Sequence, residues 1–190
     1  MDATIIIGIF GDSKYWMHRA EMAAIPSAER QGRRVIVSYS DTLAQARNSG
    51  AAKADTEWLI FLDADDELKL GYVDALMAGD GDLRAPAVQW ITTESASEPE
   101  TLHGRDIENM NPCVIGTAIR KTMFEQIGQF QEWEAWEDYA LFLKAYRQGA
   151  RIVHHPQAVY KVYDSANSRN KQNFDGAQLM SMIQLASWMA

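Results

Sequence analysis

Three aspartates within four positions directly follow a run of five bulky apolar residues. Residues 58–62 read Trp-Leu-Ile-Phe-Leu, and Asp63, Ala64, Asp65 and Asp66 come next. The run predicts a buried strand, and in an open α/β sheet ligands bind beyond the carboxyl ends of the strands. Carboxylates this close repel one another unless a cation bridges them, and oxygen ligands suit Mg²⁺ or Mn²⁺. The cluster therefore predicts half of a metal-diphosphate site, with an acidic loop that caps the following helix as the structural alternative.

A second acidic pair, Glu137-Asp138, lies close to two tryptophans, Trp133 and Trp136. The pair opens a helix predicted over residues 138–147, which allows two roles. Acidic side chains in a first turn are favoured by the helix macrodipole, and a carboxylate in a cleft can act as a general base. The tryptophans offer flat surfaces suited to sugar rings, although buried aromatic residues also simply pack.

Alternating strand and helix patterns position the first cluster. Apolar periodicity predicts strands at 4–10, 34–39 and 57–62 and helices at 14–24, 42–53 and 71–77. This order predicts an α/β fold in which a mostly parallel sheet is flanked by helices. We expect Asp41 or Ser40 to cap the second helix, and the first helix to end near Pro26.

The second half of the chain is less regular. It contains predicted strands at 87–91, 113–119, 151–154 and 159–163 and predicted helices at 121–127, 138–147 and 176–189. The polar segment 92–111 has little periodicity and is interpreted either as a mobile loop over the site or as a solvated connection. The last helix is apolar over much of its circumference. It is expected to pack on its own domain or to join two subunits as a homodimer.

Composition limits the possible classes of protein. At 190 residues, with 47% hydrophobic and 23% charged residues, the chain fits one globular domain. The net charge of −8 disfavours non-specific binding to nucleic acid or anionic lipid. The first apolar run is too short to span a membrane and lacks the basic flank of a signal peptide, so we expect a cytoplasmic protein. The single cysteine, Cys113, fits a reducing compartment and is expected to be a small buried residue.

Two blocks of sequence together resemble family 2 glycosyltransferases of the GT-A fold. They are Ala46-Arg47-Asn48-x-Gly50 with Ala54, residues 58–62 and the aspartates, and Gly128-Gln129-Phe130-Gln131-Glu132 with Trp136-Glu137-Asp138-Tyr139, Leu141 and Leu143. The resemblance covers about residues 5–163 and implies a compact single-domain member, 1–190. It implies transfer of a sugar from a nucleotide-diphosphate donor to an acceptor hydroxyl, usually with inversion and with Mn²⁺ or Mg²⁺.

The resemblance also divides the chain. It implies that residues 1–80 form the nucleotide-sugar-binding half, 81–165 the acceptor and catalytic half, and 166–190 a C-terminal helical extension. The acceptor is left open among a glycan or lipid intermediate, a protein side chain and a modified nucleobase, and the net charge disfavours the last of these.

On the metal and catalytic side, the resemblance maps Asp63, Ala64 and Asp65 onto the Asp-x-Asp motif of the family. Asp65 is then the direct metal ligand, while Asp63 lies nearer the ribose or a metal-bound water. Asp138 is the first choice for the general base that removes the acceptor proton, and Glu137 is the second.

On the nucleotide side, the resemblance makes Gly11, Asp12 and Asp41 the candidates that contact the base. Arg47 would pair with a phosphate or pack on the base, with a surface salt bridge as the alternative, and Trp136 would contact the sugar.

A late histidine often completes the metal shell in this family, and Tyr163 stands at that place here. His155, His154 or a water would then take this position, although paired histidines on a strand also serve structural roles.

Other classes fit less well. A haloacid-dehalogenase-like phosphatase needs Thr or Val where Glu67 stands, and a calcium loop needs Gly where Leu68 stands. A nucleotidyltransferase usually begins with a Gly-rich basic loop, which is absent between Phe10 and Arg19. A degenerate, non-catalytic nucleotide-sugar-binding protein of the same fold is the remaining alternative.

Overall fold

The structure is a computed structural model, and it describes residues 2–133 and 136–163. Within these residues eight strands form one sheet in the order β2-β1-β3-β7-β5-β8-β4, with β6 paired to β5. The strands are β1 (Ala3–Ile9), β2 (Arg34–Tyr39), β3 (Trp58–Leu62), β4 (Glu67–Leu68), β5 (Leu83–Ile91), β6 (Glu100–Thr101), β7 (Ala118–Arg120) and β8 (Ile152–Tyr163). The helices are α1 (Ser13–Met22), α2 (Ala24–Glu29), α3 (Leu43–Lys53), α4 (Tyr72–Ala78), α5 (Lys121–Gln126) and α6 (Glu137–Arg147). The helix predicted at 176–189 lies outside the described residues, and so do its two expected roles, packing on its own domain or joining two subunits.

Long parallel pairings dominate the sheet. β1 pairs in parallel with β2 on one side and with β3 on the other, and β5 pairs in parallel with β8. The antiparallel pairs β3–β7, β5–β7, β5–β6 and β4–β8 each join two residues of one strand to two of the other. The predicted α/β class with a mostly parallel sheet is therefore confirmed.

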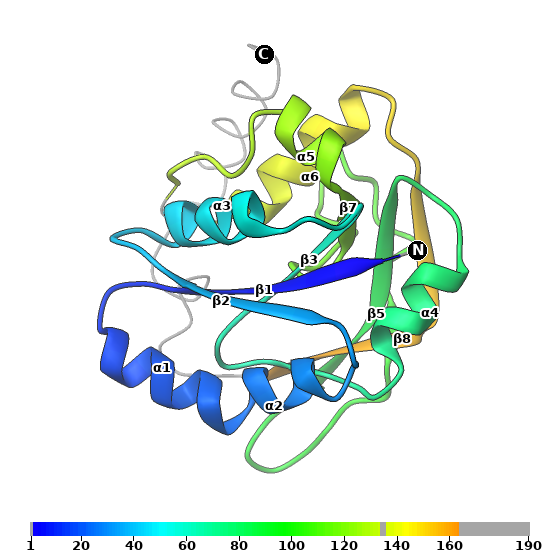
Figure 1. Cartoon of the computed structure of the whole chain (residues 1–190). Coiled ribbons are helices and arrows are strands. Elements are labelled where there is room, and N and C mark those ends of the chain that lie inside the picture. The colour runs from blue at the N-terminus through cyan, green and yellow to red at the C-terminus, as the bar shows by residue number, and fades with distance from the viewer. Residues whose placement is uncertain (1, 134–135, 164–190) are drawn as a thin grey trace.

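Helices cover both faces of the sheet around β1. Figure 1 shows α3 on one face and α1 and α2 on the other. Every residue of β1 and β3 is buried, as expected for strands covered on both sides. Among the described helices, none is long and apolar enough to cross a membrane. Because β1, β2 and β3 are parallel, their carboxyl ends meet at one edge, where Asp63 follows β3.

The helix predicted over residues 14–24 is in fact two helices. α1 ends at Met22, and Ala23 leaves the helical conformation, with φ −131° and ψ −69°, before α2 begins. Pro26 does not end a helix, since it lies in the first turn of α2. Proline is tolerated there because its missing N–H would have no partner within the helix.

The predicted cap of the second long helix is wrong. Thr42, not Asp41 or Ser40, is the N-cap of α3, and its hydroxyl accepts the N–H of Gln45 at 3.2 Å. Thr42 has the extended backbone of an N-cap residue, which places its side chain over the free N–H groups of the first turn. Asp41 is exposed at the end of the β2–α3 turn.

β5 and β8 are both longer than predicted. β5 already begins at Leu83 and includes Pro86. The ladder tolerates this proline because the register shifts directly after it. β8 is one strand rather than the two predicted at 151–154 and 159–163, since residues 156–158 bulge out of the ladder instead of ending it.

The strand predicted at 113–119 is wrong over most of its length, because β7 is only Ala118–Arg120. Before β7 the chain turns at Gly116, which lies against two buried tyrosines. A Cβ on Gly116 would come within 2.2 Å of the Tyr160 ring and 2.5 Å of the Tyr72 hydroxyl. The apolar residues that suggested a strand therefore enter the core from a turn.

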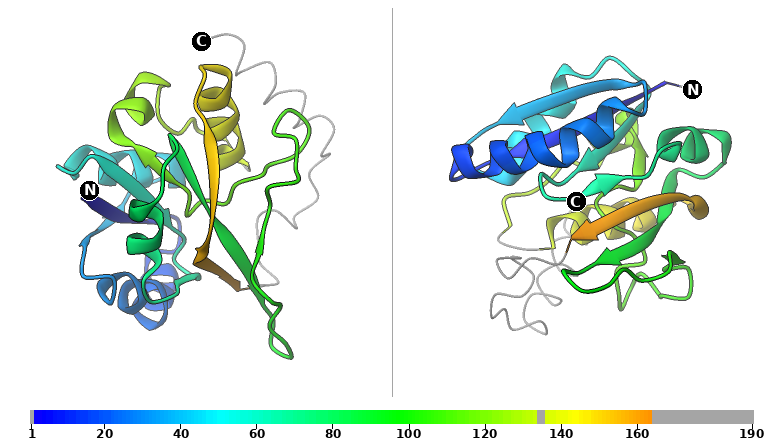
Figure 2. Two further views of the ribbon diagram at one scale, coloured as in Figure 1. Left: turned by 90° about the vertical axis from the view of Figure 1, so that its right-hand side faces the viewer. Right: turned by 90° about the horizontal axis from the view of Figure 1, so that it is seen from below.

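The polar segment 92–111 has two parts. Its beginning folds back on β5 through β6 and extends from the body as a hairpin, drawn in green in Figure 2. Its second part packs on the protein, with Leu102 and Ile107 buried. The residues between these two, 103–106, are exposed.

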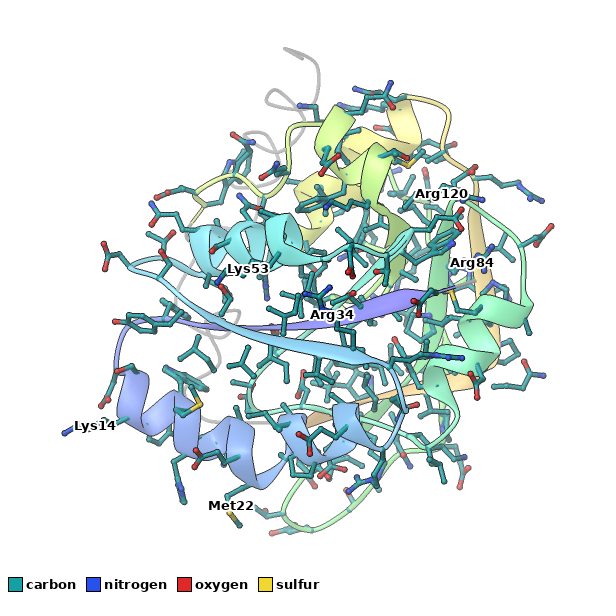
Figure 3. The ribbon with its side chains drawn as sticks, in the orientation of Figure 1. Lys14, Met22, Arg34, Lys53, Arg84 and Arg120 are labelled. Carbon is teal, nitrogen blue, oxygen red and sulfur yellow. The ribbon has the colours of Figure 1, made fainter. Side chains whose placement is uncertain are left out.

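Trp58, at the start of β3, lies between two guanidinium groups. Those of Arg84 and Arg120 are 4.0 and 4.5 Å from the centre of its ring. Both arginines are labelled toward the right in Figure 3, at the amino end of β3. These cation–π contacts hold the end of β3 that is opposite to the acidic turn.

Candidate active site

The acidic turn after β3 is fastened to the end of β8. The N–H of Asp66 donates to the C=O of Asp63 at 3.2 Å, which closes the turn. The N–H of Asp63 donates to Oη of Tyr160 at 3.2 Å, and Oδ1 of Asp66 accepts the N–H of Tyr163 at 2.9 Å. Because Tyr160 is fully buried, these bonds fix the backbone that carries Asp65 from the inside of the protein.

None of the aspartates in this turn caps the following helix. α4 begins after Gly71, which has a left-handed backbone and makes no side-chain capping bond. The structural alternative for the acidic cluster is therefore wrong. Ala64 is buried, while Asp63 and Asp65 on either side of it are partly exposed.

The environment of the turn disfavours negative charge. Burial, together with the neighbouring Asp63, raises the pKa of Asp65. Burial also raises the pKa of Asp66 well above its usual value, and repulsion from Asp63 and Asp65 adds to the rise. A raised carboxyl pKa means that the ionised form is destabilised. A cation bound at this turn would offset that cost.

Arg47 on α3 joins the acidic turn to the second acidic segment. Its Nη2 donates to Oδ1 of Asp63 at 2.5 Å, and its Nη1 donates to Oε1 of Glu137 at 2.6 Å. The side chain is 3% exposed, so the interpretation as a surface salt bridge is wrong. Gly8 of β1 makes room for it, since a Cβ there would lie 3.0 Å from Cγ of Arg47.

Two carboxylates keep Arg47 charged in the interior. Burial alone would lower its pKa, but Asp63 and Glu137 together raise it above the usual value. The guanidinium carbon also lies 5.1 Å from the centre of the Phe130 ring. A planar group with a donor on each side is suited to binding two carboxylates at once. Arg47 is therefore a fixed part of the site.

Glu137 and Asp138 open α6 beside this bridge. Glu137 is buried, while Asp138 is partly buried. Burial and the charge of Glu137 raise the pKa of Asp138 to about 6, against the opposing effect of Arg47. The residue before them, Trp136, is the N-cap and has a left-handed φ of 59°. The helix macrodipole also favours acidic residues in this first turn. That effect alone does not require Glu137 to be buried in an ion pair with Arg47, as it is here.

Asn48, next to Arg47, holds the loop that precedes the second acidic segment. Its Nδ2 donates to the C=O of Phe130 at 2.9 Å, and its Oδ1 accepts the N–H of Phe130 at 3.1 Å. Phe130 is buried against Phe61 and Phe124. The two sequence blocks that suggested the family are thus in direct contact.

The predicted base-contacting residues lie at the same edge of the sheet as the acidic turn. Gly11 follows β1 with a φ of +66°, and Asp12 caps α1 by accepting the N–H of Tyr15 at 3.2 Å. The turn after β2 is tied to the end of β1, since the N–H of Ser40 donates to the C=O of Ile9 at 3.2 Å. The capping bond of Asp12 is a structural role that the sequence interpretation omitted.

His155 is not brought to the acidic turn. Its ring fills the space beside Gly79, where a Cβ would come within 1.9 Å of it. His155 pairs with Pro86 of β5, whereas Tyr163, which binds the turn, pairs with Ile91. Pro86 and Ile91 are five residues apart along β5, so His155 and Tyr163 lie about 16 Å from each other. Tyr163 itself contacts the turn through its main-chain N–H.

The neighbouring His154 is held elsewhere as well. Its Nε2 lies 2.9 Å from the C=O of Pro112, and its ring is 6.2 Å from that of His103. Across residues 2–133 and 136–163, no three His, Cys, Asp or Glu side chains form a group that could hold a metal. Within these residues the acidic turn therefore offers carboxylates from Asp63, Asp65 and Asp66 alone.

Two further residues reach the site without having been predicted. Tyr160 supports the acidic turn, and Asn111 approaches Asp138, with Nδ2 3.4 Å from Oδ2. Both are distant in sequence from the residues they contact, so no local sequence pattern could predict these contacts. Cys113, close to Asn111, is buried as predicted, and burial raises the pKa of its thiol to about 12.

Solved structures of TarS from S. aureus share the fold. Residues 1–349 of TarS with UDP-GlcNAc give a TM-score of 0.63 at 12% identity, covering 98% of this chain and 65% of that chain. TarS 1–349 alone gives 0.58 at 16% identity (97% and 66% covered), and its UDP complex gives 0.55 at 17% (87% and 61%). This chain thus spans between 61% and 66% of the length of these structures.

The likeness in three dimensions confirms the predicted GT-A fold, while a comparison with curated proteins finds no match. The sequence model described as Glycosyl transferase family 2 matches residues 20–148. This range includes Arg47, the acidic turn and Asp138. The chain belongs to glycosyl transferase family 2.

Proposed function

We propose that this chain transfers a sugar, with inversion, from a nucleotide diphosphate to an acceptor hydroxyl. The observation that carries the proposal is the buried bridge of Arg47, which ties Asp63 of the acidic turn to Glu137 beside Asp138. A donor diphosphate at the turn and an acceptor hydroxyl at Asp138 would then lie next to each other, because Arg47 holds both acidic segments. Residues 1–80 would supply the donor half and residues 81–165 the acceptor half.

The donor would bind along the carboxyl edge of β1, β2 and β3. Gly11 and Asp12 follow β1 and Asp41 follows β2, so their turns would border the nucleobase. The sugar would lie between the acidic turn and the half-buried Trp136. Since the TarS complexes contain UDP-GlcNAc and UDP, uridine-diphosphate sugars are the first donors to test.

The acidic turn fits a divalent cation whose remaining ligands come from the donor. Mg²⁺ commonly takes one or two carboxylates together with substrate phosphates, and Mn²⁺ also accepts such oxygens. Asp65 would be the direct ligand, because Oδ1 of Asp63 already binds Arg47. The raised pKa of Asp65, caused by burial and by Asp63, supports a cation there. When bound, the cation would stabilise the charge of the departing diphosphate.

Asp138 would be the general base. A carboxylate whose pKa is raised to about 6 is ionised at neutral pH and is a stronger base than an ordinary aspartate. It would take the proton of the acceptor hydroxyl as the oxygen attacks the sugar from the face opposite the diphosphate, which gives inversion. Glu137 would hold Arg47 and so fix the start of α6. The single buried Cys113 is compatible with the cytoplasmic location that forms part of the proposal.

Thermal shift and turnover with UDP-GlcNAc, other nucleotide sugars and Mn²⁺ test this proposal. We expect the donor and Mn²⁺ together to raise the melting temperature of the parent, and the parent to hydrolyse or transfer the sugar. Asp65→Asn should lose both effects, while Asp138→Asn should keep donor binding and lose turnover. Asp74→Asn is the matched control, because Asp74 is exposed on α4 and pairs only with Arg33 among the ion pairs of the described residues.

The outcomes separate the two candidate functions. A parent that responds to no nucleotide diphosphate rejects both. A parent that binds a donor through Asp65 but shows no turnover with any acceptor or with water supports the non-catalytic nucleotide-sugar-binding protein instead.

A further inference from the structure

The loop before β7 is attached to the helix that carries Asp138. Oη of Tyr139 donates to the C=O of Ile107 at 2.7 Å, and Arg147 donates to both carboxylate oxygens of Glu108, at 3.1 and 2.5 Å. These contacts hold residues 105–113, which we call the α6 loop, along one side of α6. Ile107 is buried in this contact. The α6 loop is therefore placed independently of any ligand.

Asn111 extends from the α6 loop toward Asp138. Its Nδ2 lies 3.4 Å from Oδ2 of Asp138, and its Oδ1 accepts the N–H of Cys113 at 2.9 Å. The second bond fixes which end of the amide faces Asp138, because only the oxygen can accept an N–H. The amide nitrogen must then point at the carboxylate of Asp138, whose oxygen can accept its N–H. The C=O of Asn111 accepts a bond from Arg105 at 3.1 Å, which holds the residue further.

We propose that Asn111 is a positioning residue that holds the carboxylate of Asp138 in the orientation in which it receives the acceptor proton. This inference rests on the proposed function of Asp138. One edge of the carboxylate is directed to the amide, so rotation about the side chain is restricted. The distance of 3.4 Å is long for a hydrogen bond. Such bonds often tighten only when substrate completes the site.

If Asn111 only shaped the loop, it would need the bond from the N–H of Cys113 to its Oδ1 but not the contact of its Nδ2 with Asp138. The bond from Cys113 to Oδ1 forms a local Asx turn, which a carboxylate oxygen could make equally well. Asn111→Asp therefore keeps the shape and the turn while it replaces the donor that faces Asp138 by an acceptor. This substitution separates the two roles more sharply than Asn111→Ala.

The charged surroundings of Asp138 determine the direction of the effect. Glu137 on the same helix and Asp63 of the acidic turn raise its pKa, and Arg47 of α3 lowers it. Cys113 also approaches Asp138, and its raised pKa keeps the thiol neutral. A donor bonded to the carboxylate favours the ionised form, and a second carboxylate opposes it. Asn111→Asp should thus move the titration of Asp138 to higher pH.

The experiment measures kcat, donor affinity and the ¹³C NMR titration of the Asp138 carboxyl in the parent and in Asn111→Asp. We expect kcat to fall about tenfold or more, which is part of the roughly 10²–10⁴-fold that a general base contributes, while donor affinity stays unchanged. We also expect the titration of Asp138 to move upward. Asn109→Asp is the matched control, because Asn109 is an exposed asparagine of the same loop whose Nδ2 binds Asp106.

The inference is overturned if Asn111→Asp keeps both the kcat and the Asp138 titration of the parent, or if Asn109→Asp produces the same losses. Absence of turnover by the parent itself would instead reject the proposed function. In that case the titration of Asp138 in Asn111→Ser would still decide whether Asn111 holds Asp138, since it needs no substrate. Serine can accept the N–H of Cys113 but has neither the amide donor nor an added charge, so an upward shift reports the lost bond and an unchanged titration overturns the inference.

Discussion

Arg47 and Glu137, 90 positions apart in the sequence, form a buried ion pair with a distance of 2.6 Å. The same guanidinium binds Asp63 with its other terminal nitrogen. The bridge crosses from α3 to the start of α6 and to the end of β3, so it fixes the relative positions of the two acidic segments. It is the framework of the proposed site.

Removing Arg47 should destabilise the protein strongly. Arg47→Met leaves the buried Glu137 without this cation, and breaking a buried pair in this way costs about 3–5 kcal/mol. Urea unfolding at neutral pH measures the loss. Arg33→Met is the control, because its partner Asp74 is exposed and Arg33 is partly exposed, so that this pair is worth about 1 kcal/mol or less. Equal losses in the two variants would contradict the role of the bridge.

Replacing Asp138 should stabilise the fold while it removes activity. Its pKa of about 6 lies above the value of about 3.9 expected in the unfolded chain. The native state therefore holds this proton more tightly, and stability falls as pH rises from about 4 to about 6. Asp138→Asn escapes that loss and should be about 1–3 kcal/mol more stable at pH 7.5. A variant that is less stable there, or a difference that is constant from pH 4 to 7.5, would count against the raised pKa.

The pH dependence of turnover should follow the same group. The base must be ionised, so kcat/KM should rise with pH and reach half its maximum near pH 6. Glu137 raises the pKa of Asp138, and Glu137→Gln should therefore move this limb of the profile to lower pH. Steady-state kinetics with a saturating metal measure it. A limb that stays in place in Glu137→Gln would show that another group titrates.

Tyr160 should matter for donor binding beyond its effect on stability. Tyr160→Phe leaves the N–H of Asp63 without its acceptor, which costs about 1–3 kcal/mol, and loosens the turn that carries Asp65. Tyr72→Phe is the matched control, since Tyr72 is equally buried and donates to the C=O of Gly116 at 2.8 Å. Both variants should lose stability by unfolding assays, but only Tyr160→Phe should lose affinity for UDP with Mn²⁺ by calorimetry. Equal affinities would mean that the turn does not depend on Tyr160.

Local patterns predicted the strands and helices of the first half well. The bounds of β2 match the prediction, and β3 ends where the aspartates begin, because apolar runs and short polar turns are local signals. There are two exceptions. The apolar pattern gives no sign of the helix break at Ala23, and the two-residue strand β4 was not predicted. Predictions failed more often in the second half, where Gly116 and Pro86 act through contacts with other strands.

The individual contacts of the site were less accessible to the sequence. The sequence suggested that Arg47 meets a phosphate or the base, but it could not show that the side chain is buried between Asp63 and Glu137, where Gly8 of β1 makes room for it. Tyr160 and Asn111 meet their partners across 97 and 27 positions. No periodicity connects residues at such separations. The aspartates after an apolar run could suggest a metal-diphosphate site, but not the residues that hold it in place.

The most direct test of the central claim is the anomalous scattering of manganese in crystals grown with Mn²⁺ and UDP. We predict a peak about 2.2 Å from a carboxylate oxygen of Asp65, with the diphosphate as a further ligand. UDP bound at another place, or no manganese within bonding distance of Asp65, would contradict the assignment of the acidic turn as the donor site.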